Sequence, residues 1–140
     1  HYCRMVPERV DEKIVYGLHP LDGPVKSGDV VAVRLTVSGG SWRYLHIEDP
    51  IPAGTEFIER DDLYELKDKP AWWARWYAQR EFRDDRAVFF QTYFNGQTQH
   101  FYLLKVVNPG TFKASAARVQ PMYQPQYLAT TDSRSLAVQQ

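Results

Sequence analysis

The chain has 140 residues, enough for one domain with a substantial hydrophobic core. Its 17 basic and 17 acidic residues give a formal net charge of zero, which excludes the basic surface that most nucleic-acid and anionic-membrane binders need. An apolar share of 44%, with 9 Tyr, 7 Phe and 4 Trp, excludes a disordered chain and favours strands.

The first part of the chain predicts short strands separated by turns. Residues 2–6 and 13–16 are candidate strands, and turn clusters follow at 20–24 and 27–29. Cys3 is the single cysteine, so we expect a structural or free thiol and no intrachain disulfide. The opening residues do not resemble a signal peptide, and no apolar run reaches the roughly 18 residues of a spanning helix. Targeting signals of a longer parent would lie upstream.

Residues 30–37 form the clearest strand pattern. Val31, Val33, Leu35 and Val37 alternate with Ala32, Arg34 and Thr36, which predicts one buried face and one solvated face. Residues 43–48 read as the partner strand, and the intervening Gly39 and Gly40 fit a hairpin turn.

The middle of the chain contains a rigid corner, a long irregular loop and two further predicted hairpins. Residues 49–54 carry two prolines and Gly54, which permits a positive φ angle. Residues 60–76 read as a long loop. The remaining candidate strands are 56–58, 77–82, 87–94, 100–107, 117–120 and 135–138. The turn at 83–86 and the Asn95-Gly96 pair predict the hairpins between neighbouring strands.

These elements predict an all-β fold without a three-turn helix. Seven to eight short strands separated by turns are typical of a two-sheet antiparallel β-sandwich with one long irregular loop. The sequence shows no internal repeat and no linker, so we treat residues 1–140 as a single domain.

Catalytic and metal-binding motifs are missing from the sequence. The histidines are scattered and never paired at the spacing of zinc ligands, so no metal and no cofactor is expected. Asp84 and Asp85 lie in a turn between arginines and read as solvated. Glu48 and Asp49 abut the rigid corner, where Asp49 could accept backbone N–H groups, so we assign them a structural role. Because no nucleophile, base and orienting group come together, the sequence predicts no enzyme.

Two groups of aromatic residues allow both a structural and a functional interpretation. Trp72, Trp73 and Trp76 could form a sugar-binding platform, or they could anchor the long loop and contribute to an interdomain contact, which we favour. Met122 and Tyr123 lie close to Pro121 and Pro125, and proline excludes a helix interior or central strand. The segment should present Met122 and Tyr123 from an edge or rigid loop. The alternative is that both residues close the domain's own core.

Several blocks of residues resemble a known family. The segments Ala117-Arg-Val-Gln-Pro-Met-Tyr-Gln-Pro and Tyr44-Leu-His-Ile-Glu-Asp-Pro-Ile-Pro-Ala-Gly-Thr-Glu-Phe occur in the order found near the C-terminus of bacterial alpha-2-macroglobulins. The blocks beginning at Gly28, Asp84 and Gly110 agree with this, and the resemblance covers roughly residues 27–138. It implies the last macroglobulin-like domain, a β-sandwich and C-terminal fragment of a larger protein.

The resemblance also implies a function. Bacterial alpha-2-macroglobulins are periplasmic protease traps, often held to the inner membrane by a lipid, and many carry a Cys–Gln thioester in a neighbouring domain. The matching residues here, Met122, Tyr123, Gln124 and Pro125, would pack on that domain and shield the thioester from water. This chain has no thioester motif of its own, and some family members lack the bond. The expected partners are the other domains of the parent and, through it, target proteases.

The sequence thus supports two hypotheses from different classes. The first is an interaction domain of a protease inhibitor, with no nucleic-acid partner and no membrane insertion of its own. The alternative is a carbohydrate-binding β-sandwich that uses the tryptophans of the long loop.

Overall fold

The fold consists of β-strands joined by turns and loops throughout the part of the chain that the structure describes. The structure is a computed structural model, and it describes residues 1–60, 64–67, 78–123, 128–130 and 134–139. The strands are β1 (Tyr2–Val10), β2 (Lys13–Pro20), β3 (Val25–Lys26), β4 (Val30–Pro50), β5 (Thr55–Phe57), β6 (Ala78–Phe82), β7 (Arg86–Val106), β8 (Gly110–Ala114), β9 (Arg118–Pro121), β10 (Ala129–Thr130) and β11 (Arg134–Gln139).

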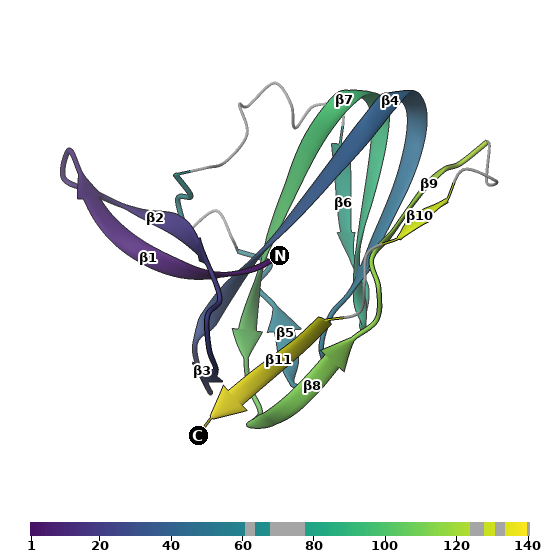
Figure 1. Ribbon diagram of the computed structural model, residues 1–140. Coiled ribbons are helices and arrows are strands. Elements are labelled where there is room, and N and C mark those ends of the chain that lie inside the picture. Colours follow the sequence, from purple (N-terminus) through teal and green to yellow (C-terminus); the bar gives the residue numbers. More distant parts are fainter. Residues whose placement is uncertain (61–63, 68–77, 124–127, 131–133, 140) are drawn as a thin grey trace.

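The strands form two sheets, as the sequence predicted. The larger sheet has eight strands, with the path β10-β9-β4-β1-β2, and with β7 joining β4 to β5 and β6. The smaller sheet has the order β3-β11-β8 and lies across the lower end of the molecule in Figure 1. Among the strands that the structure describes, all pairings are antiparallel except that of β11 with β3, which is parallel. The all-β, macroglobulin-like sandwich is therefore confirmed.

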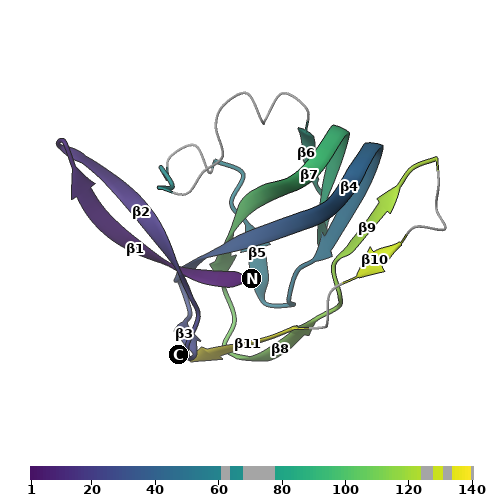
Figure 2. The same cartoon turned by 45° about the horizontal axis from the view of Figure 1, so that its top comes forward.

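The centre of the fold is a long two-stranded ribbon made by β4 and β7. These strands have 21 residues each and pair from Val30 opposite Lys105 to Pro50 opposite Arg86. The register shifts between Ser38 and Ser41, and both strands curve over together near this point (Figure 1). The turned view shows the same arch, with the two arms facing each other (Figure 2). The ribbon thereby supplies both layers of the sandwich.

Two predicted hairpins are wrong, because β4 and β7 are each one continuous strand. Residues 30–37 and 43–48 do not pair with each other but continue as one strand, and the same holds for 87–94 and 100–107. Gly39-Gly40 and Asn95-Gly96 fall near one another in the ribbon and accommodate its bend instead of closing turns. The predicted hairpin through residues 83–86 is present, because Phe82 of β6 pairs with Ala87 of β7.

The main hydrophobic core lies between the two arms of the ribbon. Val31, Val33 and Leu35 share one buried cluster with Ile47 and Phe89 from the opposite arm. The small sheet completes this cluster through residues such as Leu136 and Val138. The predicted buried face of residues 30–37 is thus confirmed, with Val37 half-buried at its end.

A second hydrophobic cluster corrects the assignment of the opposite face. Ala32 was expected on a solvated face but is fully buried. The β1–β2 hairpin crosses this side of the ribbon, and Cys3 and Leu18 pack with Leu103 around Ala32. Two faces of β4 are therefore buried at this level, while Thr36, further along the strand, is exposed.

Candidate functional site

Strand β9 places the Met122–Tyr123 segment at the rim of the larger sheet. β9 pairs with β4, so that Val119 lies opposite Ile47 and Pro121 lies opposite Leu45. The chain leaves the sheet after Pro121, which is buried and fixes its own φ angle. A rigid, anchored residue therefore directly precedes the two side chains of interest.

Tyr44 supports this segment and was not anticipated from the sequence. Its φ angle is 58°, in the left-handed region, although it lies within the long strand β4. The backbone N–H of Met122 donates to the carbonyl oxygen of Tyr44 at 2.8 Å. The rings of Tyr44 and Tyr123 make an edge-to-face contact, with centroids 5.4 Å apart and planes at 89°. The alternating pattern of a strand does not predict a left-handed φ angle. The role of Tyr44 becomes visible only through its contacts with Met122 and Tyr123.

The side chains of this group are exposed despite being apolar or aromatic. Tyr123 is 76% exposed and Met122 is 50% exposed. Tyr44, whose ring packs against Tyr123, is 43% exposed. We call Tyr44, Met122 and Tyr123 the tyrosine rim. Gln124 and Pro125, which the sequence also placed here, lie outside the described residues, as do Trp72, Trp73 and Trp76.

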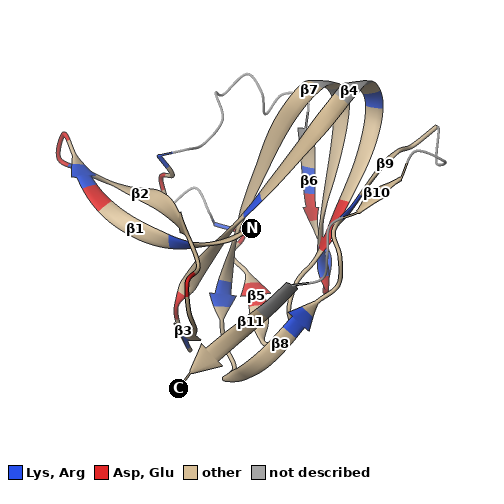
Figure 3. Ribbon diagram, viewed as in Figure 1, with Lys and Arg blue, Asp and Glu red and all other residues tan. Residues whose placement is uncertain are grey.

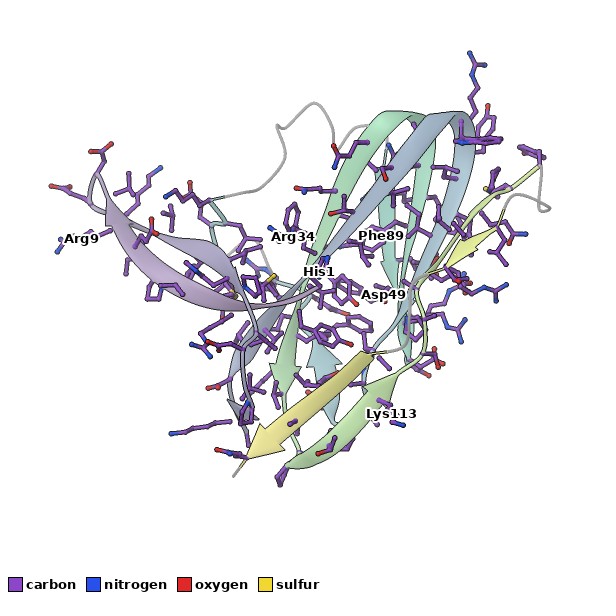
Figure 4. The ribbon with its side chains drawn as sticks, in the orientation of Figure 1. His1, Arg9, Arg34, Asp49, Phe89 and Lys113 are labelled. Atoms are coloured by element: carbon purple, nitrogen blue, oxygen red, sulfur yellow. The ribbon has the colours of Figure 1, made fainter. Side chains whose placement is uncertain are left out.

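Two pairs of buried polar side chains connect the two arms of the ribbon. The hydroxyl of Tyr102 donates to a carboxylate oxygen of Asp49, and both side chains are at most 1% exposed. Nε2 of His100 lies 3.0 Å from Oε1 of Gln91 in the core. Burial lowers the pKa of His100 to about 4, because the interior disfavours the charged imidazolium. Figure 4 labels Asp49, which lies on the second arm of β4.

The acidic residues of the turn are held by Arg86. Its guanidinium donates two hydrogen bonds to the Asp85 carboxylate, at 3.0 and 3.1 Å, and one to Glu48 at 3.1 Å. The hydrogen bond from Arg86 lowers the pKa of Asp85, which stays exposed to solvent. Glu48 and Asp49 therefore point to different partners and do not share a cleft as paired catalytic acids would.

The wider surface of the described residues carries mixed charge. Basic and acidic residues are spread over the strands instead of gathering in one region (Figure 3). Within the described ranges, no three His, Cys, Asp or Glu side chains come together as possible metal ligands. The same ranges contain no helix that is long and apolar enough to span a membrane.

Comparisons with known proteins assign the family. The family model described as the bacterial Alpha-2-macroglobulin MG10 domain matches residues 4–126. The Alpha-2-macroglobulin of Xylella fastidiosa (strain 9a5c) is 32% identical over 119 residues, a match that covers 74% of this chain and 7% of that protein. The Alpha-2-macroglobulin of Rickettsia conorii (strain ATCC VR-613 / Malish 7) is 32% identical over 108 residues, covering 73% of this chain and 6% of that protein. The chain therefore spans less than a tenth of these relatives.

Solved structures agree with this assignment. The native alpha-2-macroglobulin of Escherichia coli, in a structure from domain MG7 to the C-terminus, superposes with a TM-score of 0.68 and 28% identity. The match covers 83% of this chain and 20% of that chain. The same protein activated by porcine elastase gives a TM-score of 0.71 and 28% identity, over 83% of this chain and 11% of that chain. The chain belongs to the MG10 domain family of the bacterial alpha-2-macroglobulins.

Proposed function

We propose that this domain is an interaction module of a bacterial alpha-2-macroglobulin that acts as a broad-range protease inhibitor. In this proposal the domain occupies the C-terminal end of its parent in the periplasm and performs no catalysis itself. It packs through Met122 and Tyr123 on the neighbouring thioester-type domain and helps to hold the native conformation. The family assignment supports the proposal, as do the E. coli structures described as trypsin-activated and elastase-activated.

The observation that carries this proposal is the exposure of Tyr123 on a rigid support. A tyrosine that is 76% exposed contributes little to the core of its own domain. Large aromatic side chains are, however, among the residues that contribute most at interfaces between proteins or domains. Because Pro121 and Tyr44 already order the segment, docking against a neighbour would lose little conformational entropy. Exposure combined with order favours the interface over a role in the core.

The test compares Tyr123→Ala with Ile14→Ala in the parent protein. Ile14 is 59% exposed on the β1–β2 hairpin, which projects from the side of the molecule opposite β9 and β10 (Figures 1 and 2). Tyr123→Ala should weaken the native arrangement by roughly 1–3 kcal/mol, the scale of one interface aromatic. Where the parent has a thioester, its reaction with methylamine should accelerate, and otherwise the balance should shift towards the collapsed form.

The 140-residue chain separates this effect from simple unfolding. In that chain, Tyr123→Ala should change the free energy of unfolding by at most about 1 kcal/mol, since the Tyr123 side chain is largely exposed and the change removes its ring contact with Tyr44. A variant that unfolds the chain, or that behaves like Ile14→Ala in the parent, would contradict the proposal.

A further inference from the structure

One edge of the folded ribbon has main-chain groups that no described strand pairs. On the side of β4 that faces away from β7, β1 pairs with Val31–Val33 and β9 pairs with Leu45–Glu48. His1 extends the first pairing by one residue, because its amine donates to the carbonyl oxygen of Arg34 at 2.8 Å, and its carbonyl oxygen accepts the Arg34 N–H at 2.9 Å. Figure 4 shows the two residues side by side. Beyond them, the described residues provide no strand partner for positions 35–38 on this side.

The direction of the unpaired groups follows from Arg34. Successive residues of an antiparallel strand direct their N–H and C=O groups to alternate sides. Since both groups of Arg34 point towards β1, those of Thr36 and Ser38 point to the same side, and both residues are exposed. Unpaired donors and acceptors in a row are a template for one more strand.

A recess with mainly apolar walls lies beside this edge. Its volume is about 190 Å³, and its walls include Leu35 and Ile47 from the two arms of the ribbon, with Val37 and Val119 partly exposed to it. Its lining also includes Ala129 and Thr130 of β10 and the polar residues Thr36, Ser38 and Arg118. The recess can therefore receive side chains from a strand on the edge, at the open flank of the main core.

The register of β1 determines which positions of such a strand would face the recess. Tyr2 lies opposite Val33 and belongs to the main core, whereas Cys3 lies opposite Ala32 and belongs to the second cluster. Continuing this alternation, the residues opposite Leu35 and Val37 face the recess, and those opposite Thr36 and Ser38 face outward.

We propose that the edge of β4 at residues 35–38 binds an extended strand with apolar side chains at alternate positions, in line with β1 and antiparallel to β4. The occupant is the polypeptide that leads into β1 in a longer chain, and the matched relatives are more than ten times longer than the matched region. β1 then runs without interruption along β4 as far as Ser38, and its apolar side chains fill the recess. This proposal concerns the completeness of the sandwich and is independent of the role of Tyr123.

Two matched extensions of the 140-residue chain test the proposal. Thr-Val-Thr-Val placed before His1 directs its valines opposite Leu35 and Val37, whereas Val-Thr-Val-Thr directs its threonines there. With the first extension, amide hydrogen exchange at Thr36 and Ser38 should slow at least about tenfold relative to the unextended chain, as expected for one ordered hydrogen bond. The second extension should protect these amides less, since it leaves the recess without apolar side chains.

The measurement is repeated after dilution, so that protection by a second copy of the chain is recognised by its dependence on concentration. Unchanged exchange at Thr36 and Ser38 with both extensions would overturn the proposed strand. Equal protection by the two extensions would overturn the role of the recess in setting the register. In the longer parent protein, the same two amides should be protected as in the first extension, and rapid exchange there would exclude the proposed occupant.

Discussion

Tyr44 occupies a backbone conformation that is costly for a bulky residue. A left-handed φ costs a residue with a Cβ atom roughly 1–2 kcal/mol, and such strain persists where surrounding contacts require it. Here the conformation directs a carbonyl oxygen to Met122 and an aromatic ring to Tyr123. Tyr44 is therefore best described as the residue that positions the tyrosine rim.

Replacing Tyr44 should reduce the order of Met122 and Tyr123 while changing the stability of the domain little. Tyr44→Gly relieves the torsional strain but removes the ring, so the free energy of unfolding should change by less than about 1 kcal/mol. NMR order parameters of Met122 and Tyr123 should fall clearly in this variant. Tyr44→Phe, the control, keeps the ring contact and should keep the order parameters. Unchanged order in Tyr44→Gly would show that Pro121 alone fixes the segment.

His100 should make stability depend on pH in a defined direction. Its folded-state pKa of about 4 lies below the value near 6.5 expected in an unfolded chain, so the unfolded state binds the proton first as pH falls. The stability that the neutral imidazole provides is complete above about pH 6.5 and is lost as the pH falls towards about 4.

The comparison with His100→Gln isolates this contribution. Between neutral pH and about pH 5, the wild type should lose roughly 2 kcal/mol more than the variant, measured by urea unfolding at each pH. A difference between the two proteins that does not vary with pH would contradict the burial of a neutral His100.

At the scale of elements, the corner between β4 and β5 follows closely what the sequence predicts. Gly54 has a φ angle of 81°, as its place after two prolines indicated. Its carbonyl oxygen accepts the N–H groups of Val107 and Asn108, which joins the corner to the end of β7. A Cβ atom built on Gly54 would lie 2.8 Å from the ring of Phe112.

Gly54→Ala should therefore destabilise the domain by roughly 1–3 kcal/mol, from the unfavourable φ angle and the contact with the ring. Gly23→Ala is the matched control, because a Cβ atom there has no neighbouring atom within 4 Å. Denaturant unfolding of both variants measures the difference. Equal denaturation midpoints for the two variants would mean that the corner accommodates the added methyl group without loss of stability.

The ribbon shows why sequence patterns predicted some elements and not others. Alternation is local, so it correctly placed Val31, Val33 and Leu35 on a buried face. A glycine pair signals a change of direction but does not reveal which strand lies alongside, and the bend at Gly39-Gly40 was therefore read as a hairpin. The burial of Ala32 depends on β1 and β2 crossing a face that its own strand pattern marks as solvated.

For the same reason, the sequence predicted some residues of the candidate site and missed others. Proline spacing and the family resemblance pointed to Met122 and Tyr123, and the structure places both on the rim. The part played by Tyr44 depends on a torsion and on a contact with a residue nearly eighty positions away, so no local pattern predicts it. The carbohydrate-binding alternative rests on tryptophans outside the described residues and stays a prediction.

At the scale of the whole molecule, most of the contacts between described residues join positions that are distant in sequence. Within the ribbon, Pro50 and Arg86 are the paired residues nearest in sequence, whereas Val30 and Lys105 are the farthest apart. Because closing a longer loop costs more entropy, pairing should begin at the Pro50 end and proceed towards Val30.

Two buried valines test this order of folding. Val88 lies opposite Glu48 near the first end, and Val31 lies opposite Leu104 near the last, and both are at most 1% exposed. Val88→Ala should mainly slow folding, while Val31→Ala should mainly accelerate unfolding, as stopped-flow chevron plots would show. The opposite distribution of effects would place the nucleus at the other end of the ribbon.

The length of β4 and β7 also has a consequence for biosynthesis. All of β4 is synthesised before any of β7, and at roughly 5–20 residues per second its partner follows only after several seconds. During this interval the apolar faces around Val33 and Ile47 are uncovered, and such stretches are prone to aggregate. The nascent domain is thus expected to depend on chaperones between the synthesis of its first long strand and that of its second.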